Sequence, residues 1–119
     1  MSDSEPSQEQ TSATQAKDTY KEGFSLFVKG DAEGAIERYR AAIVISDSRA
    51  IAWNGLSMAL AQLGDLEAAV EAAQKLVELE PDDPLSHTNL SRILMQKGMI
   101  PEAEDARAQA MGLQMRGGK

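Results

Sequence analysis

The chain has 119 residues, a length that fits a single domain, and a net charge of −7 from 19 acidic and 12 basic side chains. This acidic balance argues against a general nucleic-acid binder and against a polybasic membrane-surface protein, because both need clustered Lys and Arg. The absence of Cys and the presence of a single His exclude disulfides and thiolate chemistry and argue against a zinc site or a His-based catalytic centre. The composition therefore favours a small acidic binding or scaffold module.

The N-terminal stretch 1–15 is polar, carries three acids and no base, and contains almost nothing apolar. Such a segment cannot bury enough surface to offset its ordering entropy, so we expect a disordered acidic tail over 1–15. This tail has no basic region followed by an apolar one, so no signal peptide is expected. The longest apolar run, Ala41 to Ile45, is far shorter than the roughly 20 residues of a membrane span. We therefore expect no membrane insertion and a cytoplasmic location.

From residue 16 onward, the apolar residues recur three and four positions apart, which predicts helices. Trp53, Leu56, Leu60 and Leu63 are one such series. The breaks between helical stretches carry Gly, as in Gly30-Asp31, Gly64-Asp65 and Gly98-Met99. Glycine suits the left-handed position after a helix, and Asp caps the helix that follows. Pro81 and Pro84 mark a further break, with Asp82 or Asp83 as the expected cap, and Pro101 fits a first helical turn.

These breaks are evenly spaced, since the step from Gly30 to Gly64 equals the step from Gly64 to Gly98. Four more columns of residues repeat with the same offset: Leu26, Leu60 and Leu94; Ala35, Ala69 and Ala103; Glu37, Glu71 and Asp105; Ile43, Val77 and Met111. This period of about 34 residues, with two helices in each unit, resembles that of the tetratricopeptide repeat (TPR) family.

The middle unit carries the family motif best, with Trp53, Leu56, Ala69 and Pro81 at motif positions. The resemblance implies an all-α, right-handed solenoid of helical hairpins, with about six helices in three units over 16–49, 50–83 and 84–117, and a short C-terminal tail at 118–119. In the first unit Thr19 and Glu22 replace the Trp and Leu of the motif. Terminal repeats have one uncovered side, which accounts for such polar replacements.

The resemblance also implies that the first helix of each unit lines a concave groove. Most of the residues at the implied groove positions are aromatic, aliphatic or Met, which favours burial of an apolar peptide segment from a protein partner. The residues expected to line this groove are Tyr20, Phe24, Phe27, Val28, Ile51, Asn54, Met58, Leu85, Arg92 and Met95.

Some TPR proteins clamp the C-terminal carboxylate of heat-shock chaperones with two Lys, two Asn and one Arg. The corresponding positions here hold no basic residue, so a buried carboxylate would lack its cationic donors. These five positions are Tyr20, Phe24, Gly55, Leu85 and Asn89. We therefore do not expect this clamp to operate.

No catalytic residue set, cofactor or metal site is expected. The chain has no phosphate-binding Gly-rich loop, and Asp82 and Asp83 form no calcium loop. His87 is expected to be a packed residue of the helix core. The acidic columns on the second helices, such as Glu37 and Glu71, are expected to form a solvated convex face. The chain is therefore predicted to be a non-catalytic adaptor or scaffold.

Two alternatives stay open. Apolar residues on the last helix, Met111, Leu113 and Met115, have no obvious capping helix after them, so this end is a possible site of self-assembly into a homo-oligomer. The second alternative is a small chaperone for a secretion or assembly client, because some secretion chaperones are similar three-repeat TPR proteins.

Overall fold

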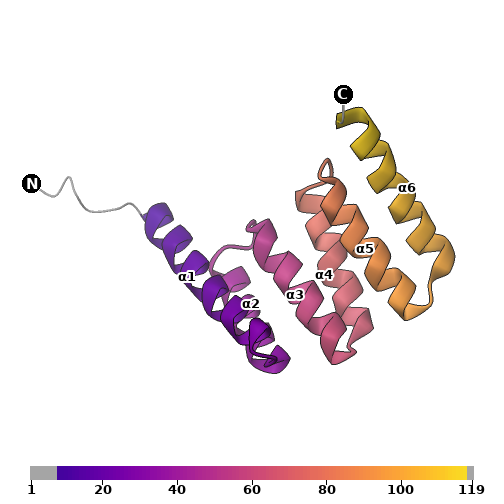
Figure 1. Ribbon diagram of the computed structural model, residues 1–119. Coiled ribbons are helices and arrows are strands. Elements are labelled where there is room, and N and C mark those ends of the chain that lie inside the picture. The colour runs from indigo at the N-terminus through magenta and orange to yellow at the C-terminus, as the bar shows by residue number, and fades with distance from the viewer. Residues whose placement is uncertain (1–7, 118–119) are drawn as a thin grey trace, which may run out of the picture.

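The computed structural model describes residues 8–117, and this part of the chain is all-α. Three helical hairpins follow one another as a solenoid, which confirms the predicted fold class (Figure 1). The helices are α1 Gln8–Val28, α2 Ala32–Ile45, α3 Ala50–Leu63, α4 Leu66–Leu79, α5 Pro84–Lys97 and α6 Ile100–Gly117. Within residues 8–117, no helix is both long and apolar enough to cross a membrane.

The predicted breaks have the expected local chemistry. Gly30, Gly64 and Gly98 adopt φ values of 93°, 92° and 90°, a region that side chains with a Cβ rarely enter. Asp31 caps α2, where its Oδ1 accepts a hydrogen bond from the Gly34 amide at 2.9 Å. Equivalent caps at α4 and α5 come from Asp65 and Asp83. The tight turns therefore fold each helix back on its predecessor.

The expectation of a disordered tail as far as residue 15 is corrected in part, because α1 begins at Gln8. Extending a formed helix by one residue costs little, since each added residue contributes a hydrogen bond and no new nucleus is needed. Ala16 is fully buried and anchors this extension at the point where α1 starts to pack. The rest of the predicted tail, residues 1–7, and residues 118–119 lie outside the described residues.

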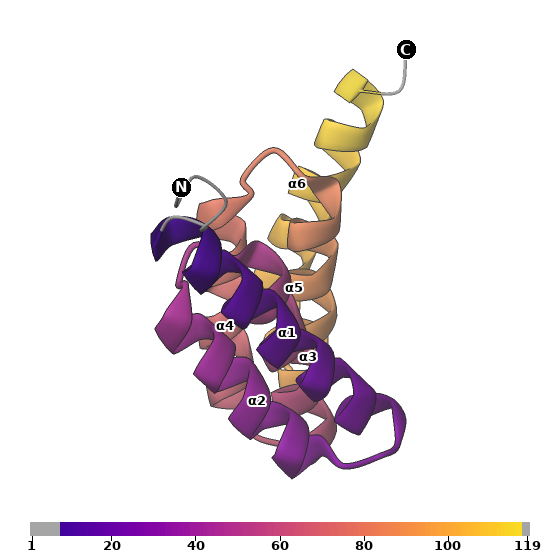
Figure 2. The same cartoon turned by 90° about the vertical axis from the view of Figure 1, so that its left-hand side faces the viewer.

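The first helices of the hairpins, α1, α3 and α5, form a row at the front of Figure 1, with α2 and α4 behind them. Each helix packs on the next one in sequence, and α3 also contacts α1 and α5. By contrast, α2 and α4 have no Cα atoms within 8 Å of each other in the described chain. The turned view in Figure 2 shows α6 extending past the rest of the array at the C-terminal end.

The core centres on Tyr39 of α2, the largest fully buried side chain. Its ring lies against two helix positions that lack a Cβ, Gly23 on α1 and Gly55 on α3. A Cβ added at Gly23 would lie 2.9 Å from this ring, and one added at Gly55 would lie 2.6 Å from it. The aromatic ring therefore lets three helices approach one another, and both glycines are needed for that approach.

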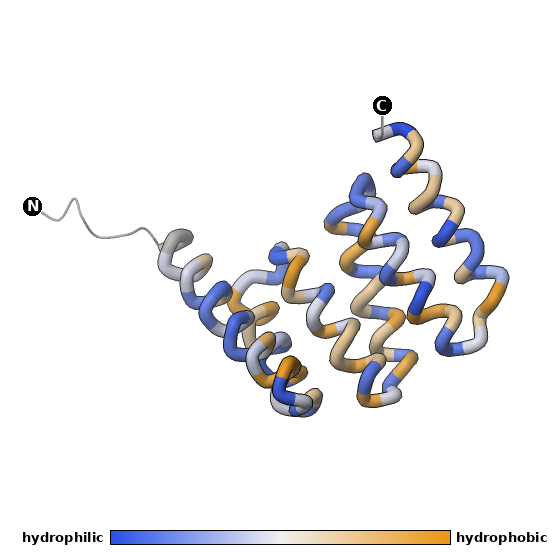
Figure 3. Tube along the Cα trace, in the orientation of Figure 1, coloured by the Kyte–Doolittle hydropathy of each residue, from blue (hydrophilic) through white to orange (hydrophobic). Residues whose placement is uncertain are grey.

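Small and aliphatic residues continue the core through the middle of the array. Ala35, Ala69 and Ala103, which form one of the repeating columns, are all fully buried. Figure 3 shows hydrophobic residues concentrated toward α3 and α4, whereas the N-terminal half of α1 is hydrophilic. This gradient is what a short solenoid requires, because only its middle unit has neighbours on both sides.

We predict that Gly55→Ala destabilises the fold by about 1–3 kcal/mol, because the new methyl group would overlap the rigid Tyr39 ring. Urea unfolding followed by circular dichroism would measure the change. Gly112→Ala is the matched control: its Cβ would meet only the Arg116 Nη1 at 3.5 Å, so it should be neutral or slightly stabilising. Equal destabilisation by both substitutions would contradict the assigned role of Gly55.

Alkaline pH should also weaken the fold through Tyr39. Burial, with neighbouring Tyr20 as the second cause, raises the pKa of Tyr39 from 10.0 to about 12. The folded state therefore keeps this proton in a pH range where the unfolded chain releases it. The stabilisation is complete below about pH 10 and is lost as the pH rises toward about 12.

We predict that Tyr39→Phe loses less stability than wild type between pH 9 and pH 11, measured as the shift of the urea midpoint. Lysine deprotonation affects both proteins equally and cancels in the comparison. Parallel pH profiles for the two proteins would refute the contribution of Tyr39.

Candidate functional site

Most of the large apolar side chains that stay exposed on α1, α3 and α5 are expected groove residues, and Leu63 of α3 is the exception. In the described chain, ten large hydrophobic residues are exposed, and five of them are groove positions. These five are Phe24, Val28, Ile51, Leu85 and Met95, with exposed fractions from 45% to 69%. An apolar row of this kind along one face has a solvation cost that a bound partner would remove.

The other expected groove residues are more enclosed. Tyr20 and Phe27 are partly buried and pack against the core. The Tyr20 ring lies between the surface and the interior, with its centroid 6.3 Å from that of Phe24 and 5.6 Å from that of Tyr39. Burial raises the pKa of Tyr20, and nearby Arg49 opposes this shift. Tyr20 thus connects exposed Phe24 to the core.

Three separate hollows share the expected groove residues. Phe27, Met58 and Arg92 line a cleft of about 180 Å³ that spans α1, α3 and α5. Ile51, Asn54 and Leu85 border a second cleft, of about 270 Å³, near the start of α3 and α5. Arg92 and Met95 also line a hollow of about 610 Å³ between α5 and α6. Seven of the ten expected groove residues thus line three separate hollows, which do not merge into a single pocket.

A buried polar pair lies beneath this surface. The Asn89 side chain is 4% exposed, and its Nδ2 donates a hydrogen bond of 2.8 Å to the Ser57 Oγ. Ser57 in turn donates to the Asn54 carbonyl at 2.8 Å. The Asn89 Oδ1 has no partner among the described residues. The sequence analysis named Asn89 only as one of the five positions that correspond to the carboxylate clamp. Its hydrogen bond to Ser57 of the middle unit could not be predicted from the sequence spacing.

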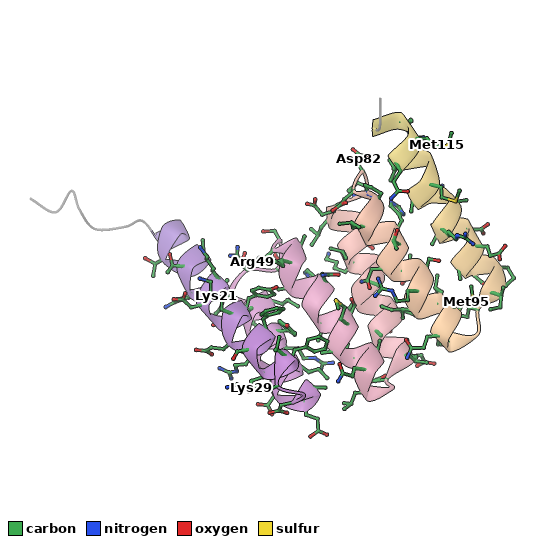
Figure 4. All side chains as sticks on the ribbon, in the orientation of Figure 1. Lys21, Lys29, Arg49, Asp82, Met95 and Met115 are labelled. Atoms are coloured by element: carbon green, nitrogen blue, oxygen red, sulfur yellow. The ribbon has the colours of Figure 1, made fainter. Side chains whose placement is uncertain are left out.

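Arg49 was not predicted to belong to the site. Figure 4 places it at the start of α3, toward α1, where it is the N-cap residue and provides no side-chain cap. Its Nε is buried and has no hydrogen-bond partner among the described residues. Arg49 therefore supplies a positive charge beside Tyr20 at the N-terminal part of the groove.

The convex side is less uniform than expected. The acidic residues Glu37 and Glu71 are exposed, but a hollow of about 800 Å³ lies between α2 and α4. Trp53, Leu56 and Leu60 of α3 form part of its lining, and Val44, which is 86% exposed, stands at its side. The hollow exists because α2 and α4 do not meet. The repeat pattern of the sequence did not predict this hollow.

His87 is packed, as expected. It is 9% exposed, and its Nε2 lies 2.8 Å from the Pro81 carbonyl, the distance of a hydrogen bond donated by that nitrogen. The C-terminal residues Met111 and Met115 are 51% and 81% exposed on α6, and Leu113 is half-buried. Across residues 8–117, no group of three or more His, Cys, Asp or Glu side chains is placed to hold a metal ion.

The sequence matches the tetratricopeptide repeat family model over residues 20–84 and 62–111. A comparison with curated proteins found no significant match. Among solved structures, the fold is similar to that of MamA, with 22% identity and a TM-score of 0.83. The match covers 88% of this chain and 61% of that one, so this chain spans less than two thirds of the MamA length.

Two further structures have a similar fold. One is the second TPR of Spaghetti (RPAP3) bound to the HSP90 peptide SRMEEVD, with 21% identity, a TM-score of 0.81 and coverage of 87% of this chain and 95% of that one. The other is the Yersinia enterocolitica type III secretion translocator chaperone SycD. It has 20% identity and a TM-score of 0.80, over 86% of this chain and 76% of that one. At these identities the likeness concerns the fold.

We predict that Ser57→Ala destabilises the protein by about 1–3 kcal/mol, because it leaves the buried Asn89 amide without its acceptor. Adding Asn89→Leu should recover a large part of this loss, since an apolar pair needs no hydrogen bond. Chemical denaturation of the four proteins of this double-mutant cycle would measure the coupling. Additive effects of the two substitutions would rule out a direct energetic link between Ser57 and Asn89.

Proposed function

The chain belongs to the tetratricopeptide repeat family, and we propose that it is a non-catalytic adaptor that binds an apolar peptide segment of a partner protein in its concave groove. The observation that carries this proposal is the exposed apolar row on α1, α3 and α5. Phe24, Ile51 and Leu85 come from three different helices, so a single extended or helical segment would contact all three units. The cytoplasmic location stays a prediction.

The groove suits apolar anchors better than a terminal carboxylate. Phe27 and Met58 line a cleft that would take one apolar side chain, and methionine adapts to anchors of different shape. Gln62 and Gln96 at the same cleft would hydrogen-bond the partner's backbone. At the N-terminal end of the groove, the buried Tyr39 ring packs against Tyr20 and holds it in place. Less conformational entropy is then lost when a partner binds.

The related structures support this class of function without defining the ligand. The Spaghetti TPR is described with a bound HSP90 peptide. In this chain, the positions implied for that type of clamp hold Gly55, which packs on Tyr39, and Leu85, which is 69% exposed. We therefore propose a partner segment that is chosen for apolar side chains, and not for an acidic C-terminus.

A chaperone role is the second candidate. It is supported by the similarity to SycD, which is described as a translocator chaperone. An apolar groove that shields a client segment has the same chemistry as one that recruits a partner. The two roles differ in the fate of the client, and co-expression with candidate clients distinguishes them, because only a chaperone keeps an otherwise insoluble client in solution.

The proposal is tested by selecting peptides that bind the wild-type protein from a displayed peptide library and measuring their affinities by fluorescence anisotropy. We predict that the selected peptides carry apolar anchors. The double variant Phe24→Glu, Met58→Glu should weaken their binding about tenfold or more, since buried carboxylates would face apolar side chains. Circular dichroism establishes beforehand that the variant is folded.

Val44→Glu is the control, because it adds a carboxylate at an exposed apolar position on the convex side of α2. It should leave the affinities unchanged. If Val44→Glu abolishes binding and the groove variant does not, the convex hollow is the binding site and the groove proposal fails.

A further inference from the structure

The hollow between α5 and α6 differs from the rest of the surface in shape and in charge. It has a volume of about 610 Å³ and lies at the C-terminal end of the array, where Figure 4 places Met95 beside α6. Met95 and Met111, both about half-exposed, supply its apolar surface from the two helices. Its lining consists of Thr88, Ser91, Arg92, Met95, Gln96, Arg107, Ala110, Met111 and Gln114.

The only charged residues of this lining are two cations, Arg92 and Arg107. Neither guanidinium forms an ion pair with a carboxylate of the described chain, where the ion pairs are Arg38–Glu22 and Lys75–Glu78. The convex hollow and the cleft at the start of α3 and α5 are different, because both contain acidic residues. The small cleft that spans α1, α3 and α5 contains Arg92 alone among charged residues. An acidic protein thus presents a large apolar hollow whose charges are all positive.

The repeat register shows what kind of element fits there. A shift by one repeat unit maps this lining onto the surface of α3 and α4 on which α5 packs. Val77 corresponds to Met111, and Ala73 corresponds to Arg107. Ala73 is fully buried, whereas Arg107, which corresponds to it at the C-terminal end, is exposed. The hollow is therefore the position that the first helix of a following unit would take.

The internal interface also shows the bonds that a helix makes at this position. On the surface of the middle unit, Asn89 of α5 donates to the Ser57 Oγ, and the Gln96 Nε2 donates to the Ala61 carbonyl at 3.3 Å. The equivalent groups at the open end are the Ser91 hydroxyl and the Met95 carbonyl. A seventh helix would find the same acceptors, with two arginines beside them.

A second copy of this chain fits the hollow poorly. If α1 of another copy packed there as α3 packs on α2, the residues at the contact would be Asp18, Lys21, Glu22 and Ser25, all exposed and polar. A symmetrical contact between two C-terminal ends would instead bring the arginines of one copy against those of the other. The first arrangement lacks apolar surface and the second opposes like charges.

We propose that the hollow between α5 and α6 binds an amphipathic helix of a partner protein that carries carboxylates beside its apolar face. The apolar side chains would enter between Met95 and Met111, and the carboxylates would pair with Arg92 and Arg107. The bound helix continues the array as the first helix of a fourth hairpin would. This site shares Arg92 and Met95 with the expected concave groove, whereas Arg107 and Met111 of α6 belong to this site alone.

The test uses a stapled helical peptide about as long as α5, with leucines along one face and glutamates on both flanks of that face. A second peptide has lysines in place of the glutamates. Isothermal titration calorimetry with the full chain should show binding of the glutamate peptide, and binding of the lysine peptide should be about tenfold weaker or more. Higher salt should reduce this difference, because the arginines are exposed.

The variant Arg92→Glu, Arg107→Glu should reverse the preference between the two peptides, and Met111→Glu should weaken both. Arg40→Glu at the convex hollow is the matched control and should change neither affinity.

Equal affinities for the two peptides, binding of neither, or a preference that survives the charge reversal would overturn the proposal. So would analytical ultracentrifugation showing that wild type forms a dimer that Met111→Glu dissociates. The variant Phe24→Glu, Met58→Glu should still bind the glutamate peptide. The experiment therefore distinguishes a failure of the groove proposal from a failure of this one.

Discussion

The packing of one aromatic ring against two glycines sets the geometry of the N-terminal half of the molecule. Tyr39 is buried at a point where α1, α2 and α3 converge, and its ring occupies the space that Cβ atoms at Gly23 and Gly55 would take. The same ring contacts Tyr20, which in turn stacks on exposed Phe24. Three aromatic rings therefore connect the core to the exposed face of α1 at this end of the array.

The evenly spaced Gly30, Gly64 and Gly98 predicted the turn within each hairpin, and Pro81 and Pro84 predicted the turn before α5. These residues act locally, so their effect does not depend on neighbours far along the chain. The start of α1 was less predictable. The polar stretch before Ala16 has no burial to gain, but a helix anchored by packing continues into it at little cost. The hollows could not be predicted from spacing at all. They depend on the separation between helices, such as the gap between α2 and α4, and the repeat spacing does not determine that separation.

The two ends of the solenoid differ in the polarity of the residues that they expose. At the N-terminal end, the positions that would face a preceding unit hold Asp18, Lys21 and Glu22, which are all exposed and polar. At the C-terminal end, Ala110 is still buried while Met111 beside it is half-exposed, so the packing chemistry of an interior unit continues to the edge. A repeat array that ends on polar residues is closed, and one that ends on apolar residues retains free energy for association. This difference favours α6 over the outer side of α1 as the place for the proposed helix contact.

The distribution of charge determines which partners would bind at the C-terminal end. With a net charge of −7, the molecule as a whole repels acidic partners at long range. Repulsion of this kind decays within about a Debye length, roughly 8–10 Å at physiological salt, so a short-range contact with Arg92 and Arg107 can outweigh it. A partner then has to bring its carboxylates into the hollow itself to pair with Arg92 and Arg107. The acidic surface suppresses non-specific binding of anionic chains, and the two arginines act only on a helix that is already seated by its apolar face.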